Sequence, residues 1–229
     1  MENKTIDNFL KALKEVEEKD YSIPRVTFKN DRIDRQGDKS STYENNFVTK
    51  LNEKYALLDF VKSIQEPQEL TRQFQIPKHY VYSVNSNPKL GESVNTIYGM
   101  FGEKAGLIEE LNLIPDFIIH KDQDDKESIN QRLIVEVKTE KDLSLKDFIW
   151  DFFKLNIYIE EFKFQTGVFL AIHTPPNKIY DHIDEYIEKN LFLTTRIMDL
   201  FIIVKENYNS EVVTLSMGEY MYKNGWEIK

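Results

Sequence analysis

Cysteine is absent from this chain of 229 residues, and glycine (8) and proline (7) are scarce. The lack of cysteine excludes disulfides, thiolate zinc sites, iron–sulfur clusters and cysteine nucleophiles, and it is typical of a reducing compartment. The low glycine and proline content excludes collagen-like and low-complexity classes. No apolar run approaches the roughly 20 residues that a membrane span needs, and the first ten residues carry charge where a secretory signal is apolar. We therefore expect a soluble, globular, cytoplasmic protein without a membrane partner.

Positive charge is also in deficit. The chain has 30 Lys and Arg against 39 Asp and Glu, which gives a formal net charge of −9. This is the wrong sign for a protein that holds nucleic acid by bulk electrostatics. Any contact with nucleic acid must therefore be local, and we expect dimerisation or a basic protein partner to strengthen the otherwise weak capture of the substrate.

Several familiar sites are missing from the sequence. It has no phosphate-binding GxxxxGK[ST] loop, no GxGxxG turn, no GxSxG elbow and no HExxH helix. Its four histidines, His79, His120, His173 and His182, do not have the spacing of zinc ligands. Zinc and nucleotide cofactors therefore have no support in the sequence.

The hydrophobic pattern predicts one domain over residues 1–229, in which 1–42 form an N-terminal helix and an irregular arm. Helical spacing of apolar residues alternates with β-branched runs along the chain, which is typical of an α/β fold with a central mixed β-sheet flanked by α-helices. The expected helices are 5–19, 43–65, 92–112, 144–162 and 181–191. The expected strands are 79–84, 115–119, 132–139, 167–173 and 200–205, with one or two more in 212–225.

The clearest chemical signal is a set of charged residues on two neighbouring strands. Asp116 opens the strand 115–119, and Glu136 and Lys138 lie within the strand 132–139. Side chains alternate along a strand, so Glu136 and Lys138 share one face. Charges in such an apolar run lose hydration unless they pair or hold a metal, and two carboxylates on adjacent strands repel without a cation between them. Carboxylate oxygens suit a hard ion such as Mg²⁺, for which Mn²⁺ can substitute.

These residues resemble the PD-(D/E)XK nuclease superfamily, whose motif is carried by Pro115-Asp116 and Glu136-Val137-Lys138. The resemblance covers residues 43–173 and implies a restriction-endonuclease-like core. In that core an upstream helix carries a glutamate, and it is followed by the Asp strand, the Glu-x-Lys strand, a long helix and a return strand. The resemblance also implies that Asp116, Glu136 and the backbone carbonyl of Val137 hold one or two divalent ions. Lys138 would then position or activate the attacking water.

Glu44 is the candidate for the upstream acid, as a catalytic residue and a further metal ligand. It lies on the apolar face of the expected helix 43–65, where a carboxylate is unfavourable unless it has a functional or structural role. Ser41-x-x-Glu44 is also a capping box, so a structural role at the start of the helix is the alternative.

Two pairs of charged residues could also have a purely structural role. A Glu136–Lys138 ion pair on an edge strand is the alternative to a metal site. Asp151 and Lys154 share one face of the expected helix 144–162, where the family often carries a polar residue near the scissile phosphate. A surface ion pair is the alternative for these two residues.

The sequence therefore predicts a Mg²⁺-dependent nuclease that hydrolyses phosphodiester bonds, with DNA as the expected substrate and water as the nucleophile. The alternatives are a catalytically silent subunit with a nuclease fold, or an acidic module that binds protein or mimics DNA. The net charge favours these alternatives, whereas the intact set of Asp116, Glu136 and Lys138 favours the enzyme.

Overall fold

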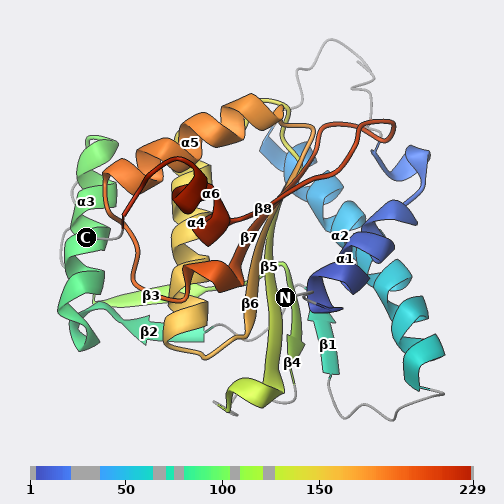
Figure 1. Ribbon diagram of the computed structural model, residues 1–229, viewed down its shortest axis with the longest axis horizontal. Coiled ribbons are helices and arrows are strands. Elements are labelled where there is room, and N and C mark those ends of the chain that lie inside the picture. Colours follow the sequence, from blue (N-terminus) through green and yellow to red (C-terminus); the bar gives the residue numbers. More distant parts are fainter. Residues whose placement is uncertain are drawn as a thin grey trace.

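The computed structural model describes residues 4–21, 37–63, 71–74, 80–103, 109–120 and 127–227. The strands of its central sheet are β1 (Thr71–Phe74), β4 (Phe117–His120), β5 (Gln131–Lys138), β6 (Thr166–Ile172), β7 (Leu200–Lys205) and β8 (Val213–Ser216). They lie in the order β1-β4-β5-β6-β7-β8 (Figure 1). Strands β2 (Tyr80–Ser83) and β3 (Glu110–Leu113) pair with each other in a separate antiparallel sheet.

The helices surround these sheets, and local chemistry fixes where two of them begin. They are α1 (Lys4–Lys14), α2 (Gly37–Ser63), α3 (Pro88–Met100), α4 (Leu145–Glu160), α5 (Pro176–Glu188) and α6 (Met217–Lys223), with short 3₁₀ helices at Glu18–Tyr21, Val84–Ser86, Ser128–Asn130 and Ile197–Asp199. Ser144 caps α4, because its hydroxyl accepts a hydrogen bond from the backbone N–H of Asp147 at 3.1 Å. Asn87 caps α3 by accepting from the backbone N–H of Lys89 at 3.0 Å. The cap at Ser144 confirms the predicted start of the helix 144–162.

The strand pairing confirms the predicted mixed sheet flanked by helices. Strands β4 and β5 form the predicted antiparallel hairpin, with Phe117 opposite Val135. Strands β5, β6 and β7 are parallel, and helices α4 and α5 lie in the connections between them. Their carboxyl ends therefore meet at one edge of the sheet, where β5 ends at Lys138 and β7 ends at Lys205.

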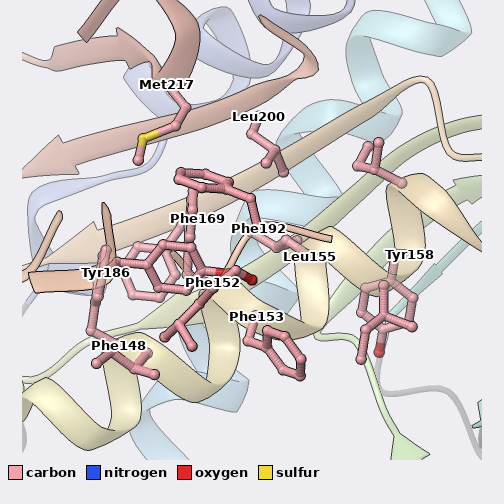
Figure 2. Close-up of a cluster of buried hydrophobic side chains, with 14 of the residues drawn as sticks. Phe148, Phe152, Phe153, Leu155, Tyr158, Phe169, Tyr186, Phe192, Leu200 and Met217 are labelled. Atoms are coloured by element: carbon pink, nitrogen blue, oxygen red, sulfur yellow. The ribbon is translucent and has the colours of Figure 1, made fainter. Parts of the chain in front are cut away.

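Two apolar clusters cover the two faces of the sheet. Helices α1 and α2 pack on one face, against Val135 and Val137, and α4 and α5 lie on the other side (Figure 1). Figure 2 shows the aromatic side chains that gather around α4. The rings of Phe148 and Phe152 stack with planes 6° apart, and Phe169 of β6 meets Phe148 edge-on. Burial on both faces explains why the sequences of the parallel strands are almost continuously apolar.

The structure corrects several predicted elements. Helix α2 spans Gly37–Ser63, so residues 37–42 of the predicted irregular arm are helical. Ser41 therefore lies inside the helix, and the predicted capping box Ser41-x-x-Glu44 is wrong. The expected helix 92–112 is α3 followed by β3, and the C-terminal part of 212–225 forms α6. Strand β1 has no counterpart among the predicted elements. These corrections fall on helix ends and on short elements, where periodicity extends over too few residues.

Some predictions lie wholly or partly outside the described residues. These are the irregular arm at 22–36, the last residues of the helix 43–65, residue 79 of the strand 79–84, and 104–108 of the helix 92–112. One domain over 1–229 stays a prediction. Within the described ranges, no helix combines the length and the apolar character that crossing a membrane requires.

Candidate active site

Asp116 and Glu136 lie side by side on neighbouring strands. The pairing of Phe117 with Val135 puts Asp116, one residue before β4, next to Glu136 on β5. The backbone N–H of Asp116 donates to the carbonyl of Val135 (3.2 Å), and Oδ2 of Asp116 accepts a hydrogen bond from the backbone N–H of Val137 (2.7 Å). The structure thus brings the two predicted carboxylates together and holds the Asp116 side chain on the backbone of the Glu-x-Lys strand.

The charged side chains of β5 face helix α4. Ile134 packs in the apolar cluster around α4, whereas Val135 and Val137 belong to the cluster under α1 and α2. Because side chains alternate along a strand, Glu136 and Lys138 share the α4 face, as the sequence predicts.

Three ion-pair contacts connect this face of β5 to α4 and α2, and a fourth joins two residues within α4. Nζ of Lys154 lies 2.9 Å from Oε2 of Glu136 and 2.6 Å from Oδ1 of Asp151. Nζ of Lys138 lies 3.0 Å from Oδ2 of Asp151 and 3.8 Å from Oε2 of Glu44. Each lysine thus joins two carboxylates, and Asp151 joins the two lysines. We call these residues, together with Asp116, the carboxylate–lysine network.

This network overturns two of the structural alternatives. Lys138 pairs with Asp151, and β5 lies between β4 and β6, so the predicted ion pair of Glu136 with Lys138 on an edge strand is wrong. Asp151 does pair with Lys154, but Asp151 is only 6% exposed. The pair is therefore buried and is not the surface ion pair of the alternative interpretation.

Burial disfavours the ionised form of three carboxylates. Glu136 is only 1% exposed, and burial raises its pKa well above the ordinary value in spite of the nearby Lys154. Burial also raises the pKa of Asp116, although the hydrogen bond from the backbone opposes this effect. For Glu44, burial outweighs the charge of Lys138 and raises the pKa to about 7. Burial therefore favours the protonated form of all three carboxylates, and an added positive charge would favour the ionised form.

The two lysines and Asp151 are held in their charged forms. Burial works against the charge of Lys138, but the carboxylates of Asp151 and Glu44 outweigh it and raise the pKa above its ordinary value. Burial likewise opposes the charge of Lys154, and Glu136 and Asp151 raise its pKa by more. The pKa of Asp151 would rise through burial, but the two lysines lower it. Both lysines are therefore cations at neutral pH.

Charge within the carboxylate–lysine network does not balance. The carboxylates of Glu44, Asp116, Glu136 and Asp151 face two ammonium groups, which leaves 4 − 2 = 2 negative charges when all groups are ionised. In addition, Oε1 of Glu136 is buried and has no hydrogen-bond partner in the described part of the chain. Burying an ionised carboxylate oxygen without a hydrogen bond is costly unless a hydrogen-bond donor or a cation contacts it.

Asp116 and Glu136 are the residues that fit a divalent ion. Mg²⁺ takes one or two protein carboxylates and completes its shell with water and substrate oxygens, which matches this pair and the unpartnered Oε1 of Glu136. Among the described residues, no group of three or more His, Asp and Glu side chains is arranged to hold an ion by itself. The carbonyl of Val137, which the resemblance implies as a ligand, stays a prediction.

Tyr158 is a residue of this region that sequence reasoning does not identify. It lies one turn after Lys154 on α4, it is fully buried, and its hydroxyl has no hydrogen-bond partner within the described ranges. Burial raises its pKa and the charge of Glu136 raises it further, so the hydroxyl stays protonated near this carboxylate. In the sequence, the spacing of four residues between Lys154 and Tyr158 indicates that both side chains lie on the same face of the helix.

A second hydrogen-bonded group anchors the helix that carries Glu44. Oη of Tyr43, the preceding residue, lies 3.1 Å from Nε2 of His173 and donates to the carbonyl of Asp20 at 3.0 Å. His173 follows β6 with φ at 71°, a left-handed conformation that is uncommon for residues other than glycine. These contacts tie α2 to the carboxyl end of β6, beside the strand that ends at Lys138.

No protein-family model, curated protein or solved structure matches this chain.

Proposed function

We propose that this chain is a metal-dependent nuclease that hydrolyses phosphodiester bonds, with DNA as its substrate. The observation that carries the proposal is a buried network in which four carboxylates face two ammonium groups and in which Glu136 keeps one oxygen unpartnered within the described residues. A divalent cation would balance this charge, and a cation held by so few protein ligands has positions left for phosphate oxygens.

The order of the elements supports a restriction-endonuclease-like core. Helix α2 with Glu44 comes first, Asp116 and the Glu-x-Lys triplet follow on the hairpin of β4 and β5, and α4 leads to the parallel return strand β6. This is the order that the resemblance to the PD-(D/E)XK superfamily implies.

Asp116 and Glu136 would hold Mg²⁺ or Mn²⁺, and the carbonyl of Val137 is a further ligand that the resemblance implies. The resemblance also implies Glu44 as a ligand, which is the alternative to a role of Glu44 as proton acceptor. Such an ion supplies charge neutralisation at the phosphate and makes water more acidic. Because burial raises the pKa of both primary carboxylates, they bind a cation in competition with protons.

Lys138 and Glu44 have complementary roles in this proposal. Lys138 stays protonated beside Asp151, so it acts as a hydrogen-bond donor that offsets charge developing on the phosphate. Glu44, with a pKa of about 7, is matched to accept a proton from the attacking water near neutral pH. The carboxylate of Glu44 lies 3.8 Å from Nζ of Lys138, so this donor and this acceptor are close together.

Cleavage assays on supercoiled DNA, single-stranded DNA and RNA test the proposal. We expect cleavage of DNA with Mg²⁺ or Mn²⁺, none in EDTA, and a loss of roughly 10²-fold or more in Asp116→Asn, Glu136→Gln and Lys138→Met. The matched control is Glu188→Gln, which removes an exposed carboxylate at the end of α5 and should leave activity unchanged. Activity that persists in EDTA, or in all three site variants, would overturn the mechanism.

The net charge of −9 favours a second candidate, a catalytically silent subunit or an acidic module that binds a basic protein or mimics DNA. Such a chain would keep the carboxylate–lysine network for stability alone. If the folded chain never cleaves nucleic acid with either ion, and Glu136→Gln leaves its binding to a basic partner unchanged, this second function replaces the first. For the nuclease, the same charge deficit is an argument that a homodimer or a basic partner helps to capture DNA.

A further inference from the structure

A pocket of about 620 Å³ lies away from the carboxylate–lysine network, on the side of the sheet that α1 covers. Lys14 of α1 and Lys205 of β7 line this pocket together with residues 208–212 and Thr214. Lys205 is the last residue of β7, so the pocket opens near the same carboxyl edge of the sheet as Lys138. A volume of this size is typical of sites for small ligands.

Lys205 is a buried ammonium group that has no carboxylate partner among the described residues. It is 6% exposed, and its Nζ donates to the carbonyls of Tyr208 (2.9 Å) and Ser210 (2.8 Å), while the ring of Tyr21 lies 5.6 Å away. In the described part of the chain neither Lys205 nor Lys14 has an ion pair with a carboxylate. Within the described ranges, the contacts of Lys205 are thus neutral oxygens and one aromatic ring, and a buried cation with no counter-ion among them is costly.

The charge of the pocket is positive on a chain that is strongly negative. Two lysines and one carboxylate, Glu211, line it, which gives 2 − 1 = 1 positive charge. Both ammonium groups belong to residues that line the same pocket, and burial and the charge of Lys14 lower the pKa of Lys205. Two like charges beside one cavity favour an anion between them.

The remaining lining residues indicate what kind of anion fits. Tyr208 is 40% exposed and offers an aromatic surface, and Asn209 and Ser210 add polar groups. An aromatic ring can stack on a base, and ammonium groups bind phosphate. A nucleotide combines both features at a size that suits the pocket.

We propose that this pocket binds a phosphate-bearing ligand of nucleotide size, with the phosphate near Lys14 and Lys205 and the base against Tyr208. The choice of a nucleotide rests on the proposed nuclease function. In register, Lys138 pairs with Ala171 of β6, and Ala171 pairs with the residue before Lys205. The two lysines are thus two strands apart along this edge, but Lys138 is on the α4 face, whereas Lys205, two residues after Ile203, is on the face that α1 and α2 cover. The pocket is therefore on the opposite face of the sheet from the carboxylate–lysine network and would bind its nucleotide as a separate subsite.

Calorimetric titrations in EDTA test the pocket without cleavage. The probes are deoxyadenosine 5′-monophosphate, deoxyadenosine without phosphate, and a single-stranded oligonucleotide. We expect Lys14→Gln to weaken binding roughly threefold to tenfold and Glu211→Gln to strengthen it. The matched control is Lys11→Gln, which removes an exposed charge from the same helix but not from the pocket, and it should bind as the wild type does.

The two sources of phosphate give different results. If the free nucleotide binds most tightly to Glu211→Gln, less tightly to the wild type and least tightly to Lys14→Gln, the pocket takes free nucleotides. If only the oligonucleotide shows this order, the pocket takes a phosphate of the nucleic-acid backbone. Equal binding by the wild type, Lys14→Gln and Glu211→Gln, or equal binding of nucleotide and nucleoside, would overturn the proposal. Because these titrations need neither metal nor turnover, a chain that shows the expected order but never cleaves DNA keeps the pocket and loses the nuclease function.

Discussion

The ammonium of Lys154 on α4 lies 2.9 Å from Oε2 of Glu136 on β5, while Oε1 of the same glutamate has no hydrogen-bond partner in the part of the chain that the structure describes. The same ammonium also pairs with Asp151 at 2.6 Å, so one positive charge is shared by two buried carboxylates. The negative charge of Glu136 is therefore only partly balanced by Lys154. A divalent ion at Glu136 and the ammonium of Lys154 would share this carboxylate, and the two charges would repel each other.

Replacing Lys154 should separate its structural role from its effect on metal binding. In Lys154→Met, Glu136 loses its cation, and breaking a buried pair from one side typically costs about 3–5 kcal/mol. We expect a loss of this order in the free energy of unfolding, measured by urea denaturation in EDTA. With Mg²⁺ the loss should shrink, because the ion no longer competes with an ammonium group.

The double variant Lys154→Met with Glu136→Gln is the control for this comparison. It removes both charges, so it should be more stable in EDTA than Lys154→Met alone and should not respond to Mg²⁺. If Mg²⁺ stabilises Lys154→Met no more than it stabilises this double variant, Glu136 is not a metal ligand.

Divalent ions should also stabilise the wild-type chain. They relieve repulsion among the ionised carboxylates of the folded state, and the unfolded chain has no assembled site. At a concentration one hundred times the dissociation constant, the gain is about 2.7 kcal/mol. Thermal melts with Mg²⁺ and Mn²⁺ measure this gain, and the double variant of Asp116→Asn and Glu136→Gln should melt at the same temperature with and without the ions.

The part of the site that lies within one strand pair could be predicted from the sequence. Asp116 and Glu136 come from a local hairpin, and side-chain alternation alone puts Lys138 on the same face as Glu136. The contacts between distant elements could not be predicted. Glu44 reaches Lys138 across 138 − 44 = 94 residues, and this contact depends on how α2 packs against the sheet.

Short secondary-structure elements could not be predicted from the sequence for a related reason. Strand β1 has the polar sequence Thr71–Phe74, and it is a strand because β4 pairs with it. Helix α6 spans only Met217–Lys223, too few residues for a helical period to stand out. Tertiary contacts determine the secondary structure of such short segments. The long apolar runs of β5, β6 and β7, by contrast, indicate strands from the sequence alone.

Two substitutions of Asp116 should separate its structural role from its chemical role. Asp116→Ala leaves the N–H of Val137 without its acceptor, which should cost about 1–3 kcal/mol of unfolding free energy. Asp116→Asn keeps an oxygen in this position, so its stability in EDTA should stay within about 1 kcal/mol of the wild type. Both variants should lose cleavage and the Mg²⁺ response. An Asp116→Asn variant that cleaves DNA normally would reduce Asp116 to a structural residue.

Glu44 should make the metal-free chain less stable as pH rises. The ordinary pKa of this side chain, 4.5, applies to the unfolded chain, whereas burial raises the pKa to about 7 in the folded chain. Between these two values the folded state binds more protons than the unfolded state, so the stability contribution of Glu44 falls with rising pH and levels off above pH 7. The whole change is roughly 3 kcal/mol at most.

Glu44→Gln removes this titration, and it gives the sharpest test of the site's electrostatics. Urea denaturation of both proteins in EDTA from pH 4.5 to 8 should show little difference at the lowest pH and a growing advantage of Glu44→Gln above pH 5. With Mg²⁺ at pH 8 the order of cleavage rates should be the reverse of the order of stabilities, because the variant lacks the carboxylate that accepts the proton. Parallel stability curves for the two proteins would mean that Glu44 has an ordinary pKa and is not part of the buried network. A variant that is more stable at high pH but cleaves DNA at the wild-type rate would leave Glu44 in the network and remove it from the proposed reaction.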